Sequence, residues 1–571
     1  MVGGDGPRGP RRRRRAVWIT VGVVALALVG LIGWLGFQVL TVRNELGQAQ
    51  AAVGELRSGG DIGDNLHKLA ASAAVAGRAA SDPVWAVAEQ VPVAGDNLRA
   101  VRVAAQTLDE LSNGVALPVL DGMKGDGGSL AALIRPLQAA QPKVSALSAE
   151  LADLPTDNLV PEVRDGVAQV KSVMKLVTPA VRFLPGLLGA DGPKNYLVVA
   201  QNNAELMPLG GSAASHTLIR VDAGKLSIVK QVTSQDFDYV TPLKQELPIG
   251  VIHLYGPIMK THPNATVSRP DWPTAASLLQ QLWNRDISKD RIDGVASLDP
   301  IALSYMLKAT GPVTMPDGQT LTSDNIVKVA LSDSYAKYGD TGDHGNSYFK
   351  AIAMAVFERV AGGGFDPKVM LQAIQEGVRN RSLMFWSADA DLEKFVASTK
   401  LGGVLPHTNK VTTSIGVFFR DHSMGTKIDY YMQPTTTVTT ACRADGTTVY
   451  TVKVDLKLNI GKAAEKKLPD YVRAHLPHQR YDTEVFIYGP LKSHIEGYQE
   501  GKGAVFRWRV KDLDRRVLKF VVSTKPGETG SLTATYTVAP GAKLGPTEVL
   551  TTPTVHPVKI SLEGQACEAS R

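Results

Sequence analysis

Three consecutive amides and a carboxylate, in the sequence Gln-Asn-Asn-Ala-Glu, follow a strand-like apolar run that begins at Asn195. Sheets of α/β proteins bind ligands at the carboxyl ends of their strands, so these side chains could hydrogen-bond a polar ligand. The same amides could instead satisfy the backbone of a tight connection. We favour the structural role for Asn203 and the ligand-facing role for Glu205. The candidate ligand-binding residues are Asn202, Asn203, Glu205, Ser212, His216 and Asp236.

Two glycines follow the polar stretch. We predict that Gln-Asn-Asn-Ala-Glu is a loop and that Gly210 and Gly211 turn the chain back beside the first strand. Together with Ser212 they could also cradle a phosphate through backbone N–H groups, although paired glycines more often only form a turn. If the loop binds a ligand, we expect Glu205 to be partly open and within reach of Asp236 or His216.

A second polar stretch, Tyr-Gly-Asp-Thr-Gly-Asp-His-Gly, contains Asp340, Asp343 and His344. Two carboxylates and an imidazole in a glycine-rich loop could hold a divalent cation, with Mg²⁺ as the candidate cofactor. Solvated loop residues are the alternative, because the spacing fits neither a calcium loop nor a zinc protease.

Standard catalytic signatures are missing from the sequence. It contains no Gly-x-Ser-x-Gly nucleophile motif, no His-Glu-x-x-His motif and no phosphate-binding loop with a Walker lysine. No catalytic residue is therefore assigned, and whether the protein is an enzyme stays open.

Cysteine usage bears on the cellular compartment. The chain has two cysteines, Cys442 and Cys567. In an oxidising compartment they would pair and close a long loop; two unpaired thiols are the alternative. So few cysteines do not predict a structural zinc site.

The charge distribution predicts a membrane anchor. The 571 residues carry a formal net charge of +7, and five of the positive charges are the run Arg11 to Arg15. Residues 16–40 follow without a charge, and as a helix they would span roughly 37 Å, enough to cross a bilayer. We predict a basic cytoplasmic tail (residues 1–15), an uncleaved signal anchor (16–40) in the lipid bilayer, and an extracytoplasmic body, which is a single-pass type II cell-membrane protein. Without the arginine run the chain is nearly neutral, so no nucleic-acid partner is expected.

Three regions with different hydrophobic periods must then position the candidate residues. Residues 41–188 are rich in alanine and have a helical period, which predicts a helical bundle or stalk. Residues 192–428 alternate strand-like and helical runs, which predicts an α/β domain in which either Asp293 or Asp299 caps a helix starting near Pro300. Residues 429–571 predict an antiparallel β-sandwich, because runs such as Tyr450 to Ile460 alternate strictly between apolar and polar. The predicted fold class is multidomain α+β.

Four segments carry a resemblance to a known family. They are NYLVVAQNNAELMPLGGS, VDAGKL, IDGVASLDPIALSYMLKATGPV and KIDYYMQ. They resemble the domain of unknown function 4012, a family of membrane-anchored envelope proteins of actinobacteria and other bacteria. The usual loop of that family has arginine where this chain has Met207, so the resemblance does not imply that the loop grips an anion.

The order of elements in the central region is also similar to the LytR-CpsA-Psr domain, which transfers lipid-pyrophosphate-linked glycopolymers to the cell wall. By position, Asp236 matches an aspartate of that domain, and Gln235 stands where it has arginine. Its later arginine cluster matches a stretch that has Lys337, His344 and Lys350 instead. Because arginine suits phosphate geometry, this resemblance implies the fold but not the transferase activity.

These observations favour an extracytoplasmic envelope protein that binds or handles a cell-surface glycopolymer or its lipid-linked precursor. The alternative is a non-catalytic scaffold or adhesion-type protein whose sandwich binds partners. Carboxylates and cations clustered around Glu205, Asp236 and His344 in a central cleft would favour the first function, and an apolar or filled cleft would favour the second.

Overall fold

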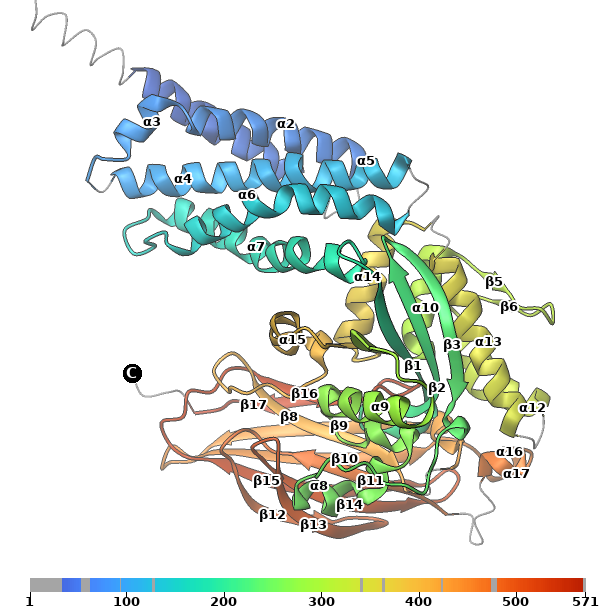
Figure 1. Ribbon diagram of the computed structural model, residues 1–571. Helices are drawn as coiled ribbons and strands as arrows, with labels where there is room; N and C mark the ends of the chain where they lie inside the picture. The colour runs from blue at the N-terminus through green and yellow to red at the C-terminus, as the bar shows by residue number, and fades with distance from the viewer. Residues whose placement is uncertain are drawn as a thin grey trace, which may run out of the picture. The chain divides into compact units, whose positions relative to one another are not determined.

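The protein is described by a computed structural model that covers residues 33–52, 62–92, 94–125, 129–338, 342–361, 365–422, 425–473 and 480–567. The chain forms two compact units, Met1–Gly192 and Pro193–Arg571 (Figure 1). The expected change from a helical to a strand-rich region near residue 190 therefore matches a boundary between units. Most of the predicted anchor, residues 16–32, lies outside the described residues. Within the described part, no helix is long and apolar enough for a membrane crossing.

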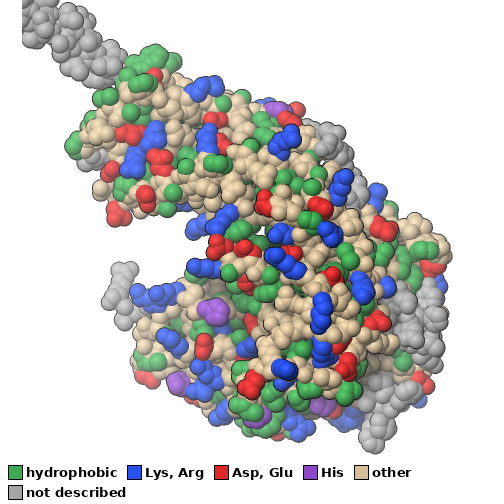
Figure 2. Space-filling model, in the orientation of Figure 1, with side chains coloured by type: hydrophobic (Ala, Val, Ile, Leu, Met, Phe, Trp, Pro, Cys, Tyr) green, Lys and Arg blue, Asp and Glu red, His purple; other side chains and the backbone are tan. Residues whose placement is uncertain are grey.

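The first unit is entirely helical where it is described. Residues 33–52 are helical, and the further elements are α2 (Ile62–Ala80), α3 (Pro83–Ala88), α4 (Ala94–Asp109), the π-helix Glu110–Ala116, α5 (Leu117–Gly125), the 3-10 helix Leu130–Leu133, α6 (Ile134–Ala152) and α7 (Pro161–Leu187). The side chain of Asp82 caps α3 by accepting from the Val84 N–H. Val103, Val144 and Met174 bring α4, α6 and α7 into one buried core. Figure 2 shows acidic and basic side chains interspersed on the drawn face of this unit.

The second unit begins with a five-stranded mixed sheet in the order β3-β2-β1-β4-β7. Only the β1–β4 pair is parallel. Its strands are β1 (Lys194–Met207), β2 (Gly210–Asp222), β3 (Lys225–Thr233), β4 (Gly294–Leu298) and β7 (Leu383–Ser387). One face packs on α9 (Trp272–Asp286) through a core that includes Leu197, Val199 and Trp283. Ala200 belongs to the core of the other face, together with Leu303 of α10 (Pro300–Thr310).

Further helices and short strands complete the central layers. They are the 3-10 helices Ser234–Asp236, Pro257–Lys260, Pro263–Ser268 and Lys400–Gly402; α8 (Ile249–Tyr255), β5 (Val313–Thr314), β6 (Thr320–Leu321), α11 (Ile326–Lys328), the π-helix Val329–Asp333, α12 (Ser334–Tyr338), α13 (Gly342–Ala361), α14 (Pro367–Arg379) and α15 (Ala390–Ala397). Of the two candidate aspartates, Asp299 caps α10: its Oδ1 accepts from the N–H of Ala302 at 2.8 Å.

Two five-stranded sheets form the sandwich, in the orders β12-β15-β10-β9-β17 and β13-β14-β11-β8-β16 (Figure 1). The strands are β8 (Thr413–Asp421), β9 (Met432–Cys442), β10 (Thr448–Leu458), β11 (Tyr481–Tyr488), β12 (His494–Glu500), β13 (Ala504–Asp512), β14 (Arg515–Thr524), β15 (Thr529–Val538), β16 (Thr547–Thr551) and β17 (Lys559–Gly564). The remaining elements of this region are the 3-10 helix Ile428–Tyr431, α16 (Lys462–Glu465) and α17 (Asp470–Arg473).

The sandwich starts earlier in the chain than residue 429, where the sequence placed it. β8 is a strand of the second sheet, and all nine of its residues are buried. A strand buried on both faces has no amphipathic alternation, so its membership of the sandwich is hard to recognise from sequence. Phe418 of β8 belongs to the same core as Val199 of the central sheet, which is why the central layers and the sandwich form one compact unit.

Candidate functional site

The Gln-Asn-Asn-Ala-Glu stretch is not the loop that we predicted. It lies inside β1, and the chain reverses at Pro208 and Leu209, so that Met207 pairs with Gly210. The ladder steps from Asn202–Ser212 directly to Leu206–Gly211, which leaves Asn203 to Glu205 as a three-residue bulge. Bulges occur where a strand must redirect a side chain. The polar residues are therefore held by a sheet, which positions them more rigidly than a loop would.

Gly211 is required where β2 crosses the bulge. A Cβ atom at this position would lie 2.0 Å from the carbonyl oxygen of Asn202, a distance that no side chain tolerates. Gly210 has φ +136°, a conformation that L side chains rarely adopt. Ser212, opposite Asn202, is 3% exposed and belongs to this close contact between strands.

Asn202 satisfies the bulge from within. Its Oδ1 accepts from the N–H of Ala204 at 3.1 Å, so the side chain replaces a ladder partner that the bulge removes. Its Nδ2 donates to the Tyr335 hydroxyl at 2.7 Å and to Glu205 Oε1 at 3.1 Å. The hydrogen bonds of Asn202 therefore fit the structural alternative, in which the amides satisfy the backbone.

Asn203 connects distant segments. Its Nδ2 donates to Asp299 Oδ2 at 2.9 Å and to the carbonyl oxygen of Pro553 at 3.1 Å, and the side chain is fully buried. Burial raises the pKa of Asp299 to about 6, although hydrogen bonds from Ala302 and Asn203 act in the opposite direction. The structural role favoured for Asn203 agrees with these contacts.

Glu205 forms an ion pair with Lys427, and both side chains are mostly buried, at 12% and 16% exposure. The next residue, Leu206, donates its N–H to Asp429 Oδ2 at 2.9 Å. Burial, together with the nearby charges of Asp421 and Glu205, raises the pKa of Asp429 well above its usual range. We call Asn202, Glu205, Tyr335, Lys427 and Asp429 the bulge cluster.

His216 and Asp236 do not join the bulge cluster by any hydrogen bond among the described residues. The His216 ring is fully buried, lies 5.1 Å from the Phe237 ring, and neither ring nitrogen has a partner. Burial lowers the pKa of His216 to about 3. Asp236 Oδ2 accepts from the N–H and hydroxyl of Thr233, at 2.7 and 3.0 Å, which closes its own 3-10 turn.

Glu205 and Asp236 nevertheless act on a common neighbour. Burial is the main cause that raises the pKa of Tyr239, and the carboxylates of Glu205 and Asp236 raise it further. The Tyr239 ring stacks on His262 at 4.2 Å. Both predicted carboxylates therefore act electrostatically on one half-buried tyrosine, which the sequence did not single out.

The predicted metal site cannot be located. Asp340 lies outside the described residues, as do the side chains of Asp343 and His344 on α13. In the described part of the chain, no three His, Cys, Asp or Glu side chains are grouped so that they could hold a metal ion.

A second buried charge cluster lies on the outer face of the β8–β11–β14 sheet. Glu484, 2% exposed, contacts Arg420 at 2.5 Å, Lys519 at 2.7 Å and His422 Nδ1 at 3.1 Å. Burial would raise the pKa of Glu484, but His422, Arg420 and Lys519 outweigh it and lower the pKa to about 2. We call these four residues the Glu484 cluster.

The two buried cations of the Glu484 cluster also cap α8. Arg420 donates to the carbonyl oxygen of Tyr255 at 2.9 Å and Lys519 to that of Leu254 at 2.6 Å. Cations at a helix C-terminus satisfy its last carbonyls and complement its dipole. The cluster therefore attaches α8 to the sandwich.

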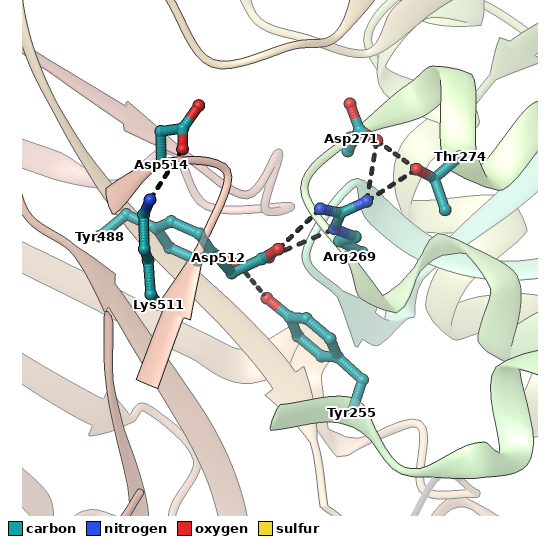
Figure 3. A network of polar contacts seen from close by, with 8 residues as sticks. All are labelled: Tyr255, Arg269, Asp271, Thr274, Tyr488, Lys511, Asp512 and Asp514. Atoms are coloured by element: carbon teal, nitrogen blue, oxygen red, sulfur yellow. Dashed lines mark hydrogen bonds and ion pairs between the residues drawn. The ribbon is translucent and has the colours of Figure 1, made fainter. Parts of the chain in front are cut away.

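A third network joins the segment before α9 to β13 (Figure 3). Arg269 holds Asp512 with two hydrogen bonds, at 2.6 and 3.2 Å, and also contacts Asp271. Asp512 accepts from the Tyr488 hydroxyl at 2.8 Å, and Tyr488 lies 2.5 Å from the Tyr255 hydroxyl. A planar guanidinium between two carboxylates is a rigid connection, so this network attaches the segment before α9 to the sandwich.

Sequence reasoning missed Lys427, Asp429, Tyr335 and the whole Glu484 cluster. Lys427 and Asp429 lie in the KIDYYMQ segment, which is the signal that could have directed attention to them. In all three networks each cation contacts a carboxylate. The pKa of Asp429 is raised, and every cation named in these networks contacts a carboxylate, so none of them is free for a phosphate ligand.

The middle of the chain matches a known family. Residues 191–335 match the model of a family described as "Protein of unknown function (DUF4012)", which confirms the expected relationship for that region. No curated protein matches the chain.

Two solved structures are distantly similar. The Lin1025 protein from Listeria innocua is 12% identical, with a TM-score of 0.22, over 39% of this chain and 85% of that chain. A putative transcriptional factor, Lmo1026 from Listeria monocytogenes, is 12% identical, with a TM-score of 0.21, over 40% and 84%. TM-scores this low do not establish a shared fold. Neither the matching family model nor these two structures identifies the LytR-CpsA-Psr family, and that resemblance stays a prediction.

Proposed function

We propose that this chain, which contains a region of the domain of unknown function 4012 family, is a membrane-anchored extracytoplasmic protein of the cell envelope. It binds a cell-surface glycopolymer or its lipid carrier and does not transfer it.

The proposal that the protein does not catalyse transfer rests on the bulge cluster, in which the one cation is already paired with a carboxylate. A pyrophosphate group with Mg²⁺ would need several fixed cations at the end of the central sheet. Lys427, the cation in the cluster, is already neutralised by Glu205, and a buried carboxyl group, Asp429, lies beside the same bulge. An incoming pyrophosphate would have to displace Glu205 and would meet further carboxylates.

The extracytoplasmic part of the proposal is supported by the pairing of Cys442 with Cys567, whose Cα atoms are 4.8 Å apart. Disulfides persist in oxidising compartments and are rare in the cytosol. The uncharged segment at residues 16–40, behind an arginine run, supplies a matching anchor.

Location is tested by thiol labelling and protease accessibility. Full-length protein taken from cells with thiols blocked on lysis should release two labelled cysteines only after reduction. Protease added to wall-stripped intact cells should digest the body of the chain. Two labelled thiols without reductant, or full protection until lysis, would contradict the location.

Binding is tested by extracting the full chain from envelopes in detergent and measuring the sugars that remain bound. An unrelated single-pass membrane protein purified in the same way is the control. We expect a defined glycan above the control level and no transfer of labelled glycopolymer from a lipid carrier by the purified chain. Sugar at the control level contradicts binding, and measurable transfer contradicts the non-catalytic assignment.

A further inference from the structure

The outer face of the β12-β15-β10-β9-β17 sheet is built mainly from short polar side chains. Inward residues such as Tyr450, Val452 and Val454 are buried, and the alternate residues point outward. Strand pairing places Thr439, Thr451 and Thr535 side by side in one row across β9, β10 and β15. Opposite residues on one face of a sheet are direct neighbours.

The row ends in a hollow at Gly497 on β12. Gly497 lies opposite Thr535, and a Cβ atom built on it would meet nothing within 4 Å. The register shift between Ile495 and Gly497 is a bulge that redirects the edge strand there. The hollow is lined by Thr451, Glu496, Gly497, Tyr498, Gln499, Thr533 and Thr535.

The hydroxyl groups that line the hollow are available. Those of Thr451, Thr533 and Thr535 make no hydrogen bond to any other group in the described part of the chain. Threonine is stiff about χ1, so these hydroxyls are held in place and lose little entropy when a ligand binds. Each hydroxyl can both donate and accept, as a sugar hydroxyl does.

Charge at the hollow is balanced. Glu496, its one charged lining residue, contacts Arg443 at 2.7 Å. Further along the face, Lys453 contacts Asp455 at 3.0 Å. Because its one charged lining residue is paired, the hollow has no free cation to attract a polyanion, and its other polar lining groups are hydroxyls and an amide. Lys457, Lys559 and Glu563 are exposed elsewhere on the same sheet. These features fit a neutral polyhydroxylated ligand.

The geometry points to a binding site for a neutral polysaccharide, which lies across the strands along the threonine row and places one sugar ring in the hollow over Gly497. Neighbouring strands are about 4.8 Å apart, close to the length of one sugar ring, so successive sugars would meet the hydroxyls of Thr535 and Thr451. The third hydroxyl of the row, that of Thr439, donates to Glu563 at 3.3 Å. The site rests on the proposed function for its biological ligand, and it adds the location and the charge class of that ligand.

The test is affinity electrophoresis of the full chain in detergent through native gels that contain a dissolved polysaccharide. Dextran, mannan and a linear galactan are the neutral probes, and polygalacturonate is the anionic one. Gly497→Trp places a large ring at the hollow, where the Cβ atom itself meets nothing within 4 Å. Gly461→Trp is the matched control, because Gly461 also has open space around it and lies outside the lining. The paired change Thr451→Val and Thr535→Val removes hydroxyls while keeping shape and strand preference.

We expect at least one neutral probe to retard the wild-type chain, Gly497→Trp and the threonine pair to lose at least tenfold in affinity, and Gly461→Trp to behave as wild type. Retardation that is equal in all variants overturns this site, and binding to polygalacturonate alone overturns the neutral class. Both results leave glycopolymer binding itself standing. A wild-type chain that is retarded by no probe, and that also carries no sugar out of the envelope, contradicts both proposals.

Discussion

The Glu484 cluster and the bulge cluster both contain buried carboxyl groups, but they differ in composition. Basic groups outnumber carboxyl groups in the first, and carboxyl groups outnumber basic groups in the second. The first surrounds one carboxylate with Arg420, Lys519 and His422. The second has one cation, Lys427, against Glu205 and Asp429. The pKa of Glu484 is lowered and that of Asp429 is raised, and in both residues burial favours the neutral form.

The difference shows that the count of partners, rather than burial, decides whether a buried carboxyl group is ionised. An ionised Glu484 is needed to neutralise two cations that cap α8. Asp429 is needed as a hydrogen-bond acceptor for the Leu206 N–H, a role that does not require a charge. The same carboxylate-to-amide substitution should therefore have opposite outcomes in the two clusters.

The largest effect is expected for Glu484→Gln. The substitution leaves Arg420 and Lys519 buried without a counter-charge, and breaking a buried pair in this way costs about 3–5 kcal/mol of unfolding free energy. Urea unfolding of the full chain in detergent measures it. Glu496→Gln, on the exposed edge strand β12, is the control and should change stability by less than about 1 kcal/mol. Equal small losses in both variants would contradict the assigned role.

His216, whose ring nitrogens make no hydrogen bond to any described residue, extends the comparison. Its folded pKa of about 3 lies below the ordinary value of 6.5, so its contribution to stability is complete above pH 6.5 and is lost as the pH falls towards 3. Between pH 7 and pH 4 this loss amounts to about 3 kcal/mol. His216→Leu should remove that part of the acid sensitivity.

Unfolding free energies at pH 7 and pH 4 test the His216 prediction. His494→Leu is the control, because His494 is exposed on β12. An identical decrease in wild type and His216→Leu would show that the buried imidazole does not titrate as proposed.

Lys427→Met removes the one cation of the bulge cluster. Glu205 then keeps only its hydrogen bond from Asn202, and we expect a loss of about 1–3 kcal/mol because a mostly buried acceptor loses its main partner. Combining it with Glu205→Gln should recover part of the loss, since the unpaired charge is gone. A double variant less stable than the sum of the single changes would contradict the pairing.

The smallest effect is expected for Asp429→Asn. A raised carboxyl pKa means that the wild type is most stable below the ordinary aspartate pKa and loses stability as the pH rises. Asparagine keeps an acceptor for Leu206 and cannot ionise, so at pH 7 the variant should be within about 1 kcal/mol of wild type or more stable. A loss as large as that of Glu484→Gln would remove the distinction between the clusters.

The features of the fold that the sequence predicted correctly depend on residues that are close together in the chain. The alternation in β10 and the cap at Asp299 follow from neighbouring residues, and both are confirmed. The bulge was mistaken for a loop, because polar residues that close on themselves in a strand have the same composition as a turn. Lys427 and Asp429 were missed because they approach β1 only through tertiary packing, more than two hundred residues along the chain.

The last strands also constrain the order in which the chain can fold. β16 and β17 pair in parallel with β8 and β9, and between them Pro553 accepts from Asn203 and Thr552 donates to Pro208. Residues 547–564 leave the ribosome after every residue they contact. The Asn203 side chain must therefore wait for its Pro553 acceptor until 350 further residues have been synthesised. A chain that stops before residue 552 lacks both the acceptor for Asn203 and the donor to Pro208, so the turn between β1 and β2 would remain incompletely hydrogen-bonded.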